Sequence, residues 1–386
     1  MIKKALCIIL ALSTLLLGGC WNNRDLDELG VVTAIGVDQA PNGYVALTYQ
    51  VITLAQTSST GSSSGTNAGS GSTLTVSSQG KTMFDAARNM IPKLGKKAYL
   101  SQMQLLVIGQ KAAVQGFENT WDFFERDHEP SRVFRIIVAK NSTAKSIITA
   151  QCGDEDISAV EIADSITNDS LGKNVSIQAF SISDLLAQPL TGIVTGVIDP
   201  NHSNNLTDMK VSGGAVFKNA RLVGFLGEDE TRGYLFGSNK IKSTILIIAN
   251  PEESRNRVSI ELIGSKSKLT AKLENGKPKL GIQIKAFGNI GEEQGYTNLS
   301  NLVDIKKMEQ EASALIAENI RKMLAKAQKR LDSDILNFNS ILYKHQYGDF
   351  EKIKGDWNKL YREATISIQV QFTIRRSGII TKPAYE

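Results

Sequence analysis

Apolar and polar residues alternate along the first half of the chain with two different periods. Residues 29–37 and 44–54 have the apolar, β-branched composition of strands, and the turn between them contains Pro41, Asn42 and Gly43. Four apolar residues then recur at the spacing of a helix: Phe84, Ala87, Met90 and Ile91. The pattern predicts a sheet with helices packed on it.

Strand-like and helix-like segments continue to alternate up to residue 198. Strands are predicted at 74–76, 104–108, 132–139 and 193–198. Helices are predicted at 114–124, 144–150 and 157–167, and a further helix from Ser181 with Asp184 in its first turn. Residues 57–72 are almost entirely Ser, Gly and Thr, which favours a flexible loop. We predict a mixed α/β domain over residues 20–200.

Two further domains are predicted after a polar boundary at residues 199–208. Residues 209–251 have the pattern of a small middle domain, with a hairpin, a helix at 228–236 and a strand at 243–249. The C-terminal domain, 254–386, begins with strands at 258–262 and 269–273. The dipeptide Asn275-Gly276 follows them and is a strong hairpin signal.

A long amphipathic helix dominates the C-terminal domain. Apolar residues from Ile305 to Leu331 trace one face, and Lys, Glu and Arg fill the other. Residues 366–374 alternate between apolar and polar, which is typical of a strand with one face in a core. We predict an antiparallel sheet with the long helix across it. The chain is then of α+β or mixed α/β class, with three consecutive domains, each a β-sheet with packed helices.

The N-terminus has the pattern of a secretory leader that ends at a lipidated cysteine. Lys3 and Lys4 precede an apolar run at 5–17, shorter than the roughly 20 residues that span a bilayer. The next residues, Leu17-Gly18-Gly19-Cys20, resemble the lipobox of bacterial lipoproteins. The resemblance implies a signal peptide at 1–19, acylation of Cys20 and a membrane-anchored body outside the cytoplasm. The alternatives are an ordinary signal peptide and an uncleaved anchor helix.

Charge and cysteine content narrow the function classes. The 386 residues carry a formal charge of +5, and removing Lys3 and Lys4 with the leader leaves +3. This excess is mild and forms no basic stripe interleaved with aromatic residues, so nucleic-acid binding is not expected. Of the three cysteines, Cys7 belongs to the leader and Cys20 is the acylation site. Cys152 therefore has no partner for an intrachain disulfide.

Catalytic and metal-binding patterns are weak throughout the chain. Residues 61–65 match G-x-S-x-G but lie in the Ser/Gly loop, not at a strand-to-helix turn. Two S-x-x-K matches, at 142–145 and 265–268, fit a helix N-cap and a strand connection. The acidic run 154–156 lacks the ligand spacing of a calcium loop. The histidines are far apart in the sequence, at His128, His202 and His345. We predict no catalytic, metal-binding or cofactor site.

Four regions of the chain carry a family likeness. The first region is 20–29 with 36–38 and 49–52, and the second is 96–100 with 106–109. The third is 216–218 with 222–224 and Glu230-Thr231-Arg232-Gly233. The fourth is Asp334-Ile335-Leu336-Asn337-Phe338 with Trp357 and the last strand. Together with the lipobox they resemble the Ger(x)C family, the lipoprotein C subunits of spore germinant receptors. The chain departs from this pattern at Asn337, where glycine is expected, and in its Ser/Gly insert.

The resemblance implies a non-enzymatic subunit without a cofactor. Such a subunit sits on the outer face of the spore inner membrane beside two integral-membrane partners, the A and B subunits, and the complex responds to nutrient germinants. Whether it contacts the small-molecule germinant is left open. Two other classes stay in consideration. A solute-binding lipoprotein of a transporter needs two similar lobes, and a cell-wall enzyme needs a nucleophile, a metal or paired carboxylates.

Overall fold

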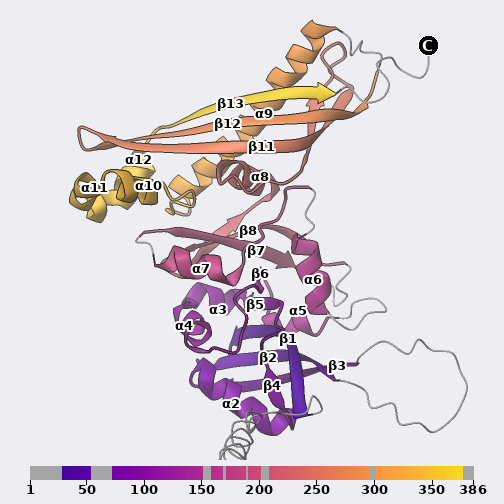
Figure 1. Cartoon of the computed structure of the whole chain (residues 1–386), viewed down its shortest axis with the longest axis vertical. Coiled ribbons are helices and arrows are strands. Elements are labelled where there is room, and N and C mark those ends of the chain that lie inside the picture. Colours follow the sequence, from indigo (N-terminus) through magenta and orange to yellow (C-terminus); the bar gives the residue numbers. More distant parts are fainter. Residues whose placement is uncertain are drawn as a thin grey trace, which may run out of the picture.

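The computed structural model describes residues 28–53, 72–150, 158–167, 171–187, 190–200, 208–295 and 301–376. These residues form two β-sheets that follow one another along the long axis of the molecule (Figure 1). Helices pack on both sheets, so the predicted mixed α and β class is confirmed. Several positions named above lie outside the described residues: Cys20, 57–71, Cys152, 154–156 and His202.

The first sheet has nine strands and is parallel at its centre. The strand order is β3-β2-β1-β5-β6-β7-β8-β9, and β4 pairs with one end of β1. Strands β1, β5, β6 and β7 are parallel, whereas β2, β3, β8 and β9 are antiparallel to their neighbours. The bounds are β1 (Leu29–Gln39), β2 (Val45–Thr53), β3 (Ser72–Gly80), β4 (Lys97–Tyr99), β5 (Leu105–Gly109), β6 (Arg135–Ala139), β7 (Gly192–Asp199), β8 (Lys210–Lys218) and β9 (Arg221–Leu226).

Helices cover both faces of this sheet. All five residues of β5 are buried, as expected of a parallel strand between two helical layers. Gly116, at φ +116°, separates two helices where the sequence predicts one at 114–124. One face carries α2 (Met83–Leu94), α3 (Gln110–Gln115), α4 (Glu118–Arg126) and α7 (Ala179–Leu186), and the other carries α5 (Ala144–Ile148) and α6 (Ser158–Thr167).

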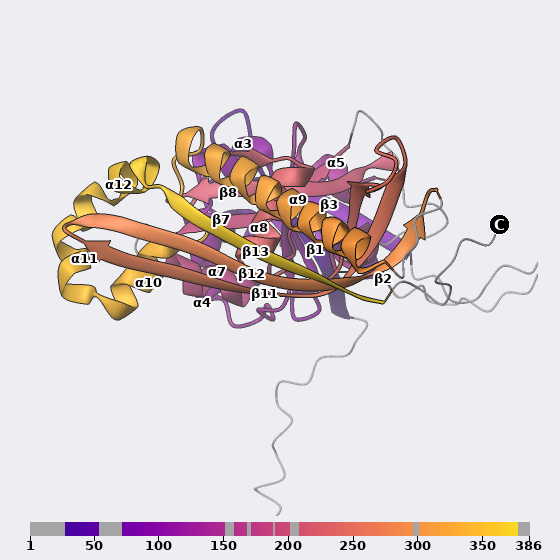
Figure 2. The ribbon, with the colours of Figure 1, turned by 90° about the horizontal axis from the view of Figure 1, so that it is seen from above.

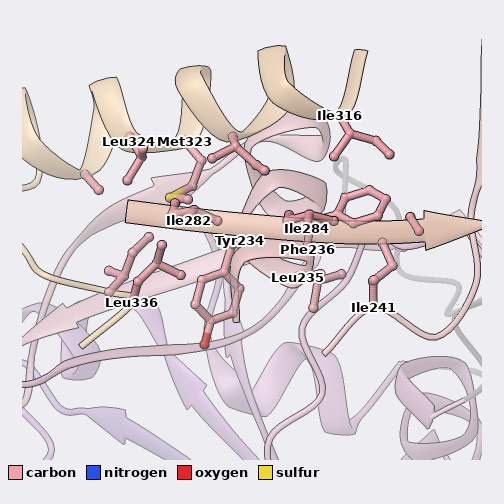
Figure 3. Packing of buried hydrophobic residues seen from close by; sticks show 14 of the residues in the cluster. Tyr234, Leu235, Phe236, Ile241, Ile282, Ile284, Ile316, Met323, Leu324 and Leu336 are labelled. Atoms are coloured by element: carbon pink, nitrogen blue, oxygen red, sulfur yellow. The ribbon is translucent and has the colours of Figure 1, made fainter. Parts of the chain in front are cut away.

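The second sheet has four strands in the order β10-β11-β12-β13. Its strands are β10 (Ile245–Ala249), β11 (Arg257–Glu274), β12 (Lys277–Glu293) and β13 (Ile366–Arg376). Two helices, α8 (Glu228–Gly237) and α9 (Leu302–Lys329), pack on its apolar face (Figure 3). Three short helices gather at the end of the sheet beside the β11–β12 turn (Figures 1 and 2): α10 (Phe338–His345), α11 (Tyr347–Ile353) and α12 (Trp357–Glu363).

The long amphipathic helix is confirmed as α9, and it also covers the edge of the sheet. It runs beside β13 (Figure 2). The Ser313 hydroxyl accepts a hydrogen bond from the Phe372 N–H at 3.0 Å, and Glu309 Oε1 accepts one from the Ile374 N–H at 2.9 Å. An edge strand exposes N–H groups that can pair with another chain. These two side chains of α9 satisfy two such groups of β13.

The second sheet departs from its sequence pattern in two ways. Residues 258–262 and 269–273 belong to one 18-residue strand, β11, with a register shift between Leu262 and Gly264. The predicted antiparallel sheet is wrong at its last strand, because β13 runs parallel to β12. The crossover between them contains α9 and the three short helices, and a crossover of that kind permits parallel pairing. The hairpin at Asn275-Gly276 is confirmed, with φ values of +52° and +75°.

The segment predicted as a middle domain contributes strands to both sheets. Strands β8 and β9 extend the nine-stranded sheet, β10 begins the four-stranded sheet, and α8 lies between the two (Figure 1). The division of the chain into three consecutive domains stays a prediction.

Candidate functional site

A groove with a volume of about 1020 Å³ lies over β1 and β2, between α2 and α4. Its apolar lining comes from Tyr49, Met83, Ala87, Leu100 and Phe123, among others. Of the apolar residues that the sequence places at helical spacing on α2, Met90 is buried in the core. By contrast, 56% of Phe84 and 47% of Ile91 are exposed, and both line the groove. Helix α2 therefore has two apolar stripes, and the one with Phe84 and Ile91 is largely exposed at the groove.

Segments that carry the family resemblance build the walls and floor of this groove. Val37 and Asp38 come from the first region, and Lys97, Ala98 and Leu100 from the second. The Asp38 carboxylate accepts hydrogen bonds from the Ala144 and Lys145 N–H groups at 2.8 and 2.9 Å, and so caps the N-terminus of α5. Burial raises the pKa of Asp38, although these two N–H groups act in the opposite direction. We therefore assign Asp38 a positioning role.

The segment 49–52 holds another helix in place and supplies the groove floor. Gln50 is buried, and its Oε1 accepts hydrogen bonds from the Thr33 hydroxyl and from the Ala159 N–H at the start of α6, both at 3.1 Å. The neighbouring Tyr49 lines the groove, and 1% of it is exposed. Burial raises its pKa, and the negative charges of Asp127 and Glu129 add to this effect.

Charge is divided between the two sides of the groove. The α2 side presents Lys81 and Arg88, and the Arg88 guanidinium lies 4.8 Å from the centre of the Phe84 ring. The α4 side presents a different set: Asp122, Arg126, Asp127 and Glu129. Lys97 forms a 2.6 Å ion pair with Glu129 at the lining. The α2 side is net positive and the α4 side is net negative.

A second cluster of family-like segments joins the two sheets. The N–H of Gly192, at the start of β7, is within 3.3 Å of the Asp334 carbonyl oxygen and 3.2 Å of Asn337 Oδ1. Lys218 of β8 forms a 2.6 Å ion pair with Asp332, which also pairs with Arg362 at 2.8 Å. The segment 332–337 therefore contacts both β7 and β8.

The departure at Asn337 has a direct structural explanation. Asn337 has φ +58° and ψ +45°, the left-handed conformation that glycine adopts without cost. Asparagine is among the residues that tolerate it best. Its side chain also accepts the hydrogen bond from Gly192 N–H. Asparagine therefore preserves the turn and adds a contact between the sheets.

Asp334 is buried beside two aromatic side chains in the same cluster. Its Oδ2 accepts a 2.9 Å hydrogen bond from Asn339 N–H, and 3% of the residue is exposed. Burial raises the pKa of the carboxyl to about 6, while N–H groups at the start of α10 and the Trp357 indole lower it. The rings of Trp357 and Tyr361 stack with centroids 6.1 Å apart, and both residues are buried.

The third family-like segment forms the crossing of α8 and α9. The Glu230 carboxylate accepts a 2.6 Å hydrogen bond from the Gly227 N–H and pairs with Lys326 of α9, also at 2.6 Å. Gly233 faces the backbone of Asn319 and Ile320, with no room for a side chain between the helices. The family-like residues 230–233 therefore form a close contact between α8 and α9.

Glu228, at the start of α8, links it to the nine-stranded sheet. Its carboxylate pairs with Lys173 at 2.8 Å and also with Lys210 of β8. Hydrogen bonds from these two ammonium groups lower the pKa of Glu228 to about 2. Carboxylates that are ion-paired in the folded state stabilise it only while they are ionised.

Replacing Glu228 with glutamine is expected to lower the free energy of unfolding at pH 7 by about 1 kcal/mol, a modest value because about a third of the side chain is exposed. The ionised carboxylate stabilises the fold above its unfolded-state pKa of 4.5, and this contribution disappears as the pH falls towards about 2. Urea unfolding of both proteins at pH 7 and pH 2.5 measures the effect. A constant difference between the proteins at the two pH values would contradict the assignment.

The remaining chemical candidates do not come together in one place. The segment 142–145 surrounds the N-cap of α5, where Thr143 is the capping residue, and 265–268 lies within β11. The His128 side chain is 96% exposed, 4.0 Å from Asp127 Oδ1. Within the part of the chain that the structure describes, no three His, Cys, Asp or Glu side chains are grouped as metal ligands. In that same part, no helix is both long and apolar enough to cross a bilayer.

Comparison with known protein families gives a match in each half of the chain. Residues 22–198 match the family described as spore germination protein N-terminal domain, and residues 212–378 match spore germination B3/GerAC like, C-terminal. Spore germination protein KC of Bacillus subtilis (strain 168) is 26% identical, with 99% of this chain and 98% of that protein aligned. Spore germination protein B3 of the same organism is 22% identical, over 95% and 96%.

A solved structure has the same fold. The crystal structure of the GerBC protein superimposes with a TM-score of 0.58 at 18% sequence identity, covering 91% of this chain and 99% of that one. The two family matches follow one another in order and leave little of the chain unmatched. The chain therefore belongs to the Ger(x)C family of spore germination proteins.

Proposed function

We propose that this protein is the lipid-anchored, non-enzymatic C subunit of a spore germinant receptor. It is held through Cys20 on the outer face of the spore inner membrane, beside the two integral-membrane A and B subunits. The observation that carries the proposal is the match of both family domains, in order, across residues 22–198 and 212–378. Relatives named as spore germination proteins align over nearly their whole length.

The anchor is supported by the lipobox-like Leu17-Gly18-Gly19-Cys20. Two or more acyl chains hold a protein stably on a bilayer, whereas one chain gives marginal binding. A diacylglyceryl group on Cys20 would therefore retain the folded body without a spanning helix.

Substitution of Cys20 by alanine tests the anchor. We expect the variant to fold, to leave the inner-membrane fraction of spores and to lose most of its nutrient-triggered germination activity. The matched control is Cys152→Ala, which removes the other mature cysteine and should leave membrane association unchanged. Mass spectrometry of the N-terminal peptide identifies the modification directly. An unmodified Cys20 thiol, or membrane retention of Cys20→Ala, would falsify the anchor.

Purification of the complex from spore membranes tests the receptor assignment. Tagged wild-type protein is expected to carry two multi-span subunits with it, and antibodies to either subunit should recover the tagged chain. Recovery of a transporter permease in their place would favour the solute-binding lipoprotein. That alternative needs two similar lobes, whereas the described residues form two unlike sheets of nine and four strands.

A further inference from the structure

We propose that the groove between α2 and α4 is a docking site for an amphipathic helix of a partner protein. The partner helix would present an apolar stripe to the groove floor, carboxylates to the α2 side and cations to the α4 side. This inference goes beyond the proposed function, because it rests on the groove alone and on no property of the anchor or of the relatives.

Two large apolar side chains of α2 are exposed to solvent at the groove. Phe84 and Ile91 are separated by two helical turns on α2, about 10 Å at 1.5 Å per residue. They are 56% and 47% exposed, and Tyr44, which also lines the groove, is 37% exposed. Exposed apolar side chains that gather in one groove, rimmed by polar groups, are typical of binding sites.

The position of the groove suits a helical partner. It lies in the helical layer of the sheet, with α2 on one side and α3 and α4 on the other, over the buried Tyr49. Because α2 and α4 also contact each other directly, a partner helix would lie over the open side of the groove and place its side chains between Phe84 and Ile91 of α2. Amphipathic helices bind such grooves through apolar anchors at positions i, i+3 or i+4, and i+7.

Charge decides what kind of partner fits. Lys81 and Arg88 give the α2 side two positive charges, and neither forms an ion pair within 4.0 Å with another of the described residues. On the α4 side, Arg126 pairs with Asp122 and Lys97 pairs with Glu129, and Asp127 leaves this side with one negative charge in excess. Complementary charges across an interface fix the register of a partner and select against wrong ones.

The same charges argue against a lipid surface as the occupant. An anionic bilayer attracts clusters of Lys and Arg and is repelled by carboxylates. Phe84, Ile91 and Arg88 alone would suit such a surface, yet Asp122 and Asp127 face the same groove. A protein segment that carries both signs satisfies both sides.

Three synthetic helices test the proposal against the purified full-length protein. All three share an apolar stripe, and their flanks are acidic and basic, both acidic, or both basic. Fluorescence anisotropy measures the dissociation constants. We expect the mixed-charge helix to bind about tenfold more tightly than either of the others, which corresponds to about 1.4 kcal/mol.

Variants of the groove make the test specific. Phe84→Ser combined with Ile91→Ser should weaken binding of the mixed helix by about tenfold or more, because both apolar anchors are removed. The matched control is Val133→Ser, which changes a residue that is 59% exposed outside the groove and should leave binding unchanged. Lys81→Glu combined with Arg88→Glu makes both sides acidic and should transfer the preference to the helix with two basic flanks.

Several outcomes would overturn the proposal. They are equal binding of the three helices, no binding at all, and unchanged binding to the double-serine variant. Displacement of the helix by phosphatidylglycerol vesicles would assign the groove to lipid. Dimerisation that depends on Phe84 and Ile91 would assign it to a second copy of the chain. Circular dichroism of each variant confirms that the fold is intact.

Discussion

Replacing Gly233 with alanine is expected to lower the free energy of unfolding by about 3 kcal/mol or more. At this position α8 crosses α9, and a Cβ would lie 3.0 Å from the Ile320 nitrogen and closer still to the Asn319 carbonyl group. Both neighbours are backbone, so no side-chain rotation can relieve the overlap. The two helices must separate, and the apolar contacts around Phe236 and Ile316 separate with them (Figure 3).

A second glycine in a helix provides the control for this experiment. Gly348 lies in α11, and a Cβ built there meets nothing within 4 Å. Alanine is the better helix former by roughly 1 kcal/mol, so Gly348→Ala should stabilise the protein slightly. Urea unfolding, followed by circular dichroism, compares both variants with the wild type. A loss of less than about 1 kcal/mol for Gly233→Ala would contradict the close crossing of α8 and α9.

Strands in which apolar and polar residues alternate regularly could be predicted from the sequence. The direction in which each strand pairs with its neighbours could not. Ile366 to Ile374 alternate with polar residues, and this pattern identified β13 correctly. Alternation is the same in parallel and antiparallel strands, because it reports only that one face is buried. The direction of β13 follows from the path of the chain through α9 to α12, and no local pattern records that path.

The interruption predicted within β11 has a specific cause. Ser267 lies on the face of β11 that packs towards the core, where the alternating pattern predicts an apolar residue. Its polar side chain interrupts that pattern, and this is why the sequence predicts a connection between two strands here. Its N–H donates to Asn239 Oδ1 at 2.8 Å, and its hydroxyl donates to the Gly237 carbonyl at 2.9 Å. Both partners lie at the C-terminal end of α8. The serine at this position is therefore explained by its contact with the end of α8, which the local sequence pattern does not show.

The candidate sites were predictable in part. The family-like segments contain Asp38, Gly233 and Asp334, so these residues could be selected from the sequence. Their roles could not. The structure shows that Asp38 caps α5, that Gly233 permits the close crossing of α8 and α9, and that Asp334 accepts a hydrogen bond from the start of α10. The groove could not be predicted, because Phe84 and Ile91 have the same helical spacing as core residues. Which of these residues are exposed depends on how the helices pack on the sheet, and the spacing does not record this.

Asp334→Asn is expected to remove a pH dependence of stability that amounts to about 3 kcal/mol. Burial raises the pKa of this carboxyl from 3.8 to about 6, so the folded protein holds the proton more tightly than the unfolded chain does. The stabilising contribution is complete below about pH 4 and disappears as the pH rises through about 6. Asparagine has no proton to lose in this range.

The measurement is the difference in unfolding free energy between wild type and Asp334→Asn at several pH values from 3.5 to 7. All other carboxylates titrate in both proteins and cancel in this difference. The wild type should lose about 3 kcal/mol relative to the variant between pH 4 and pH 7. Trp357→Phe gives an independent check, because the indole lowers the pKa of Asp334. Without the indole the loss should begin in the same range and continue to higher pH. Parallel profiles for wild type and Asp334→Asn would mean that the buried carboxyl does not titrate in this window.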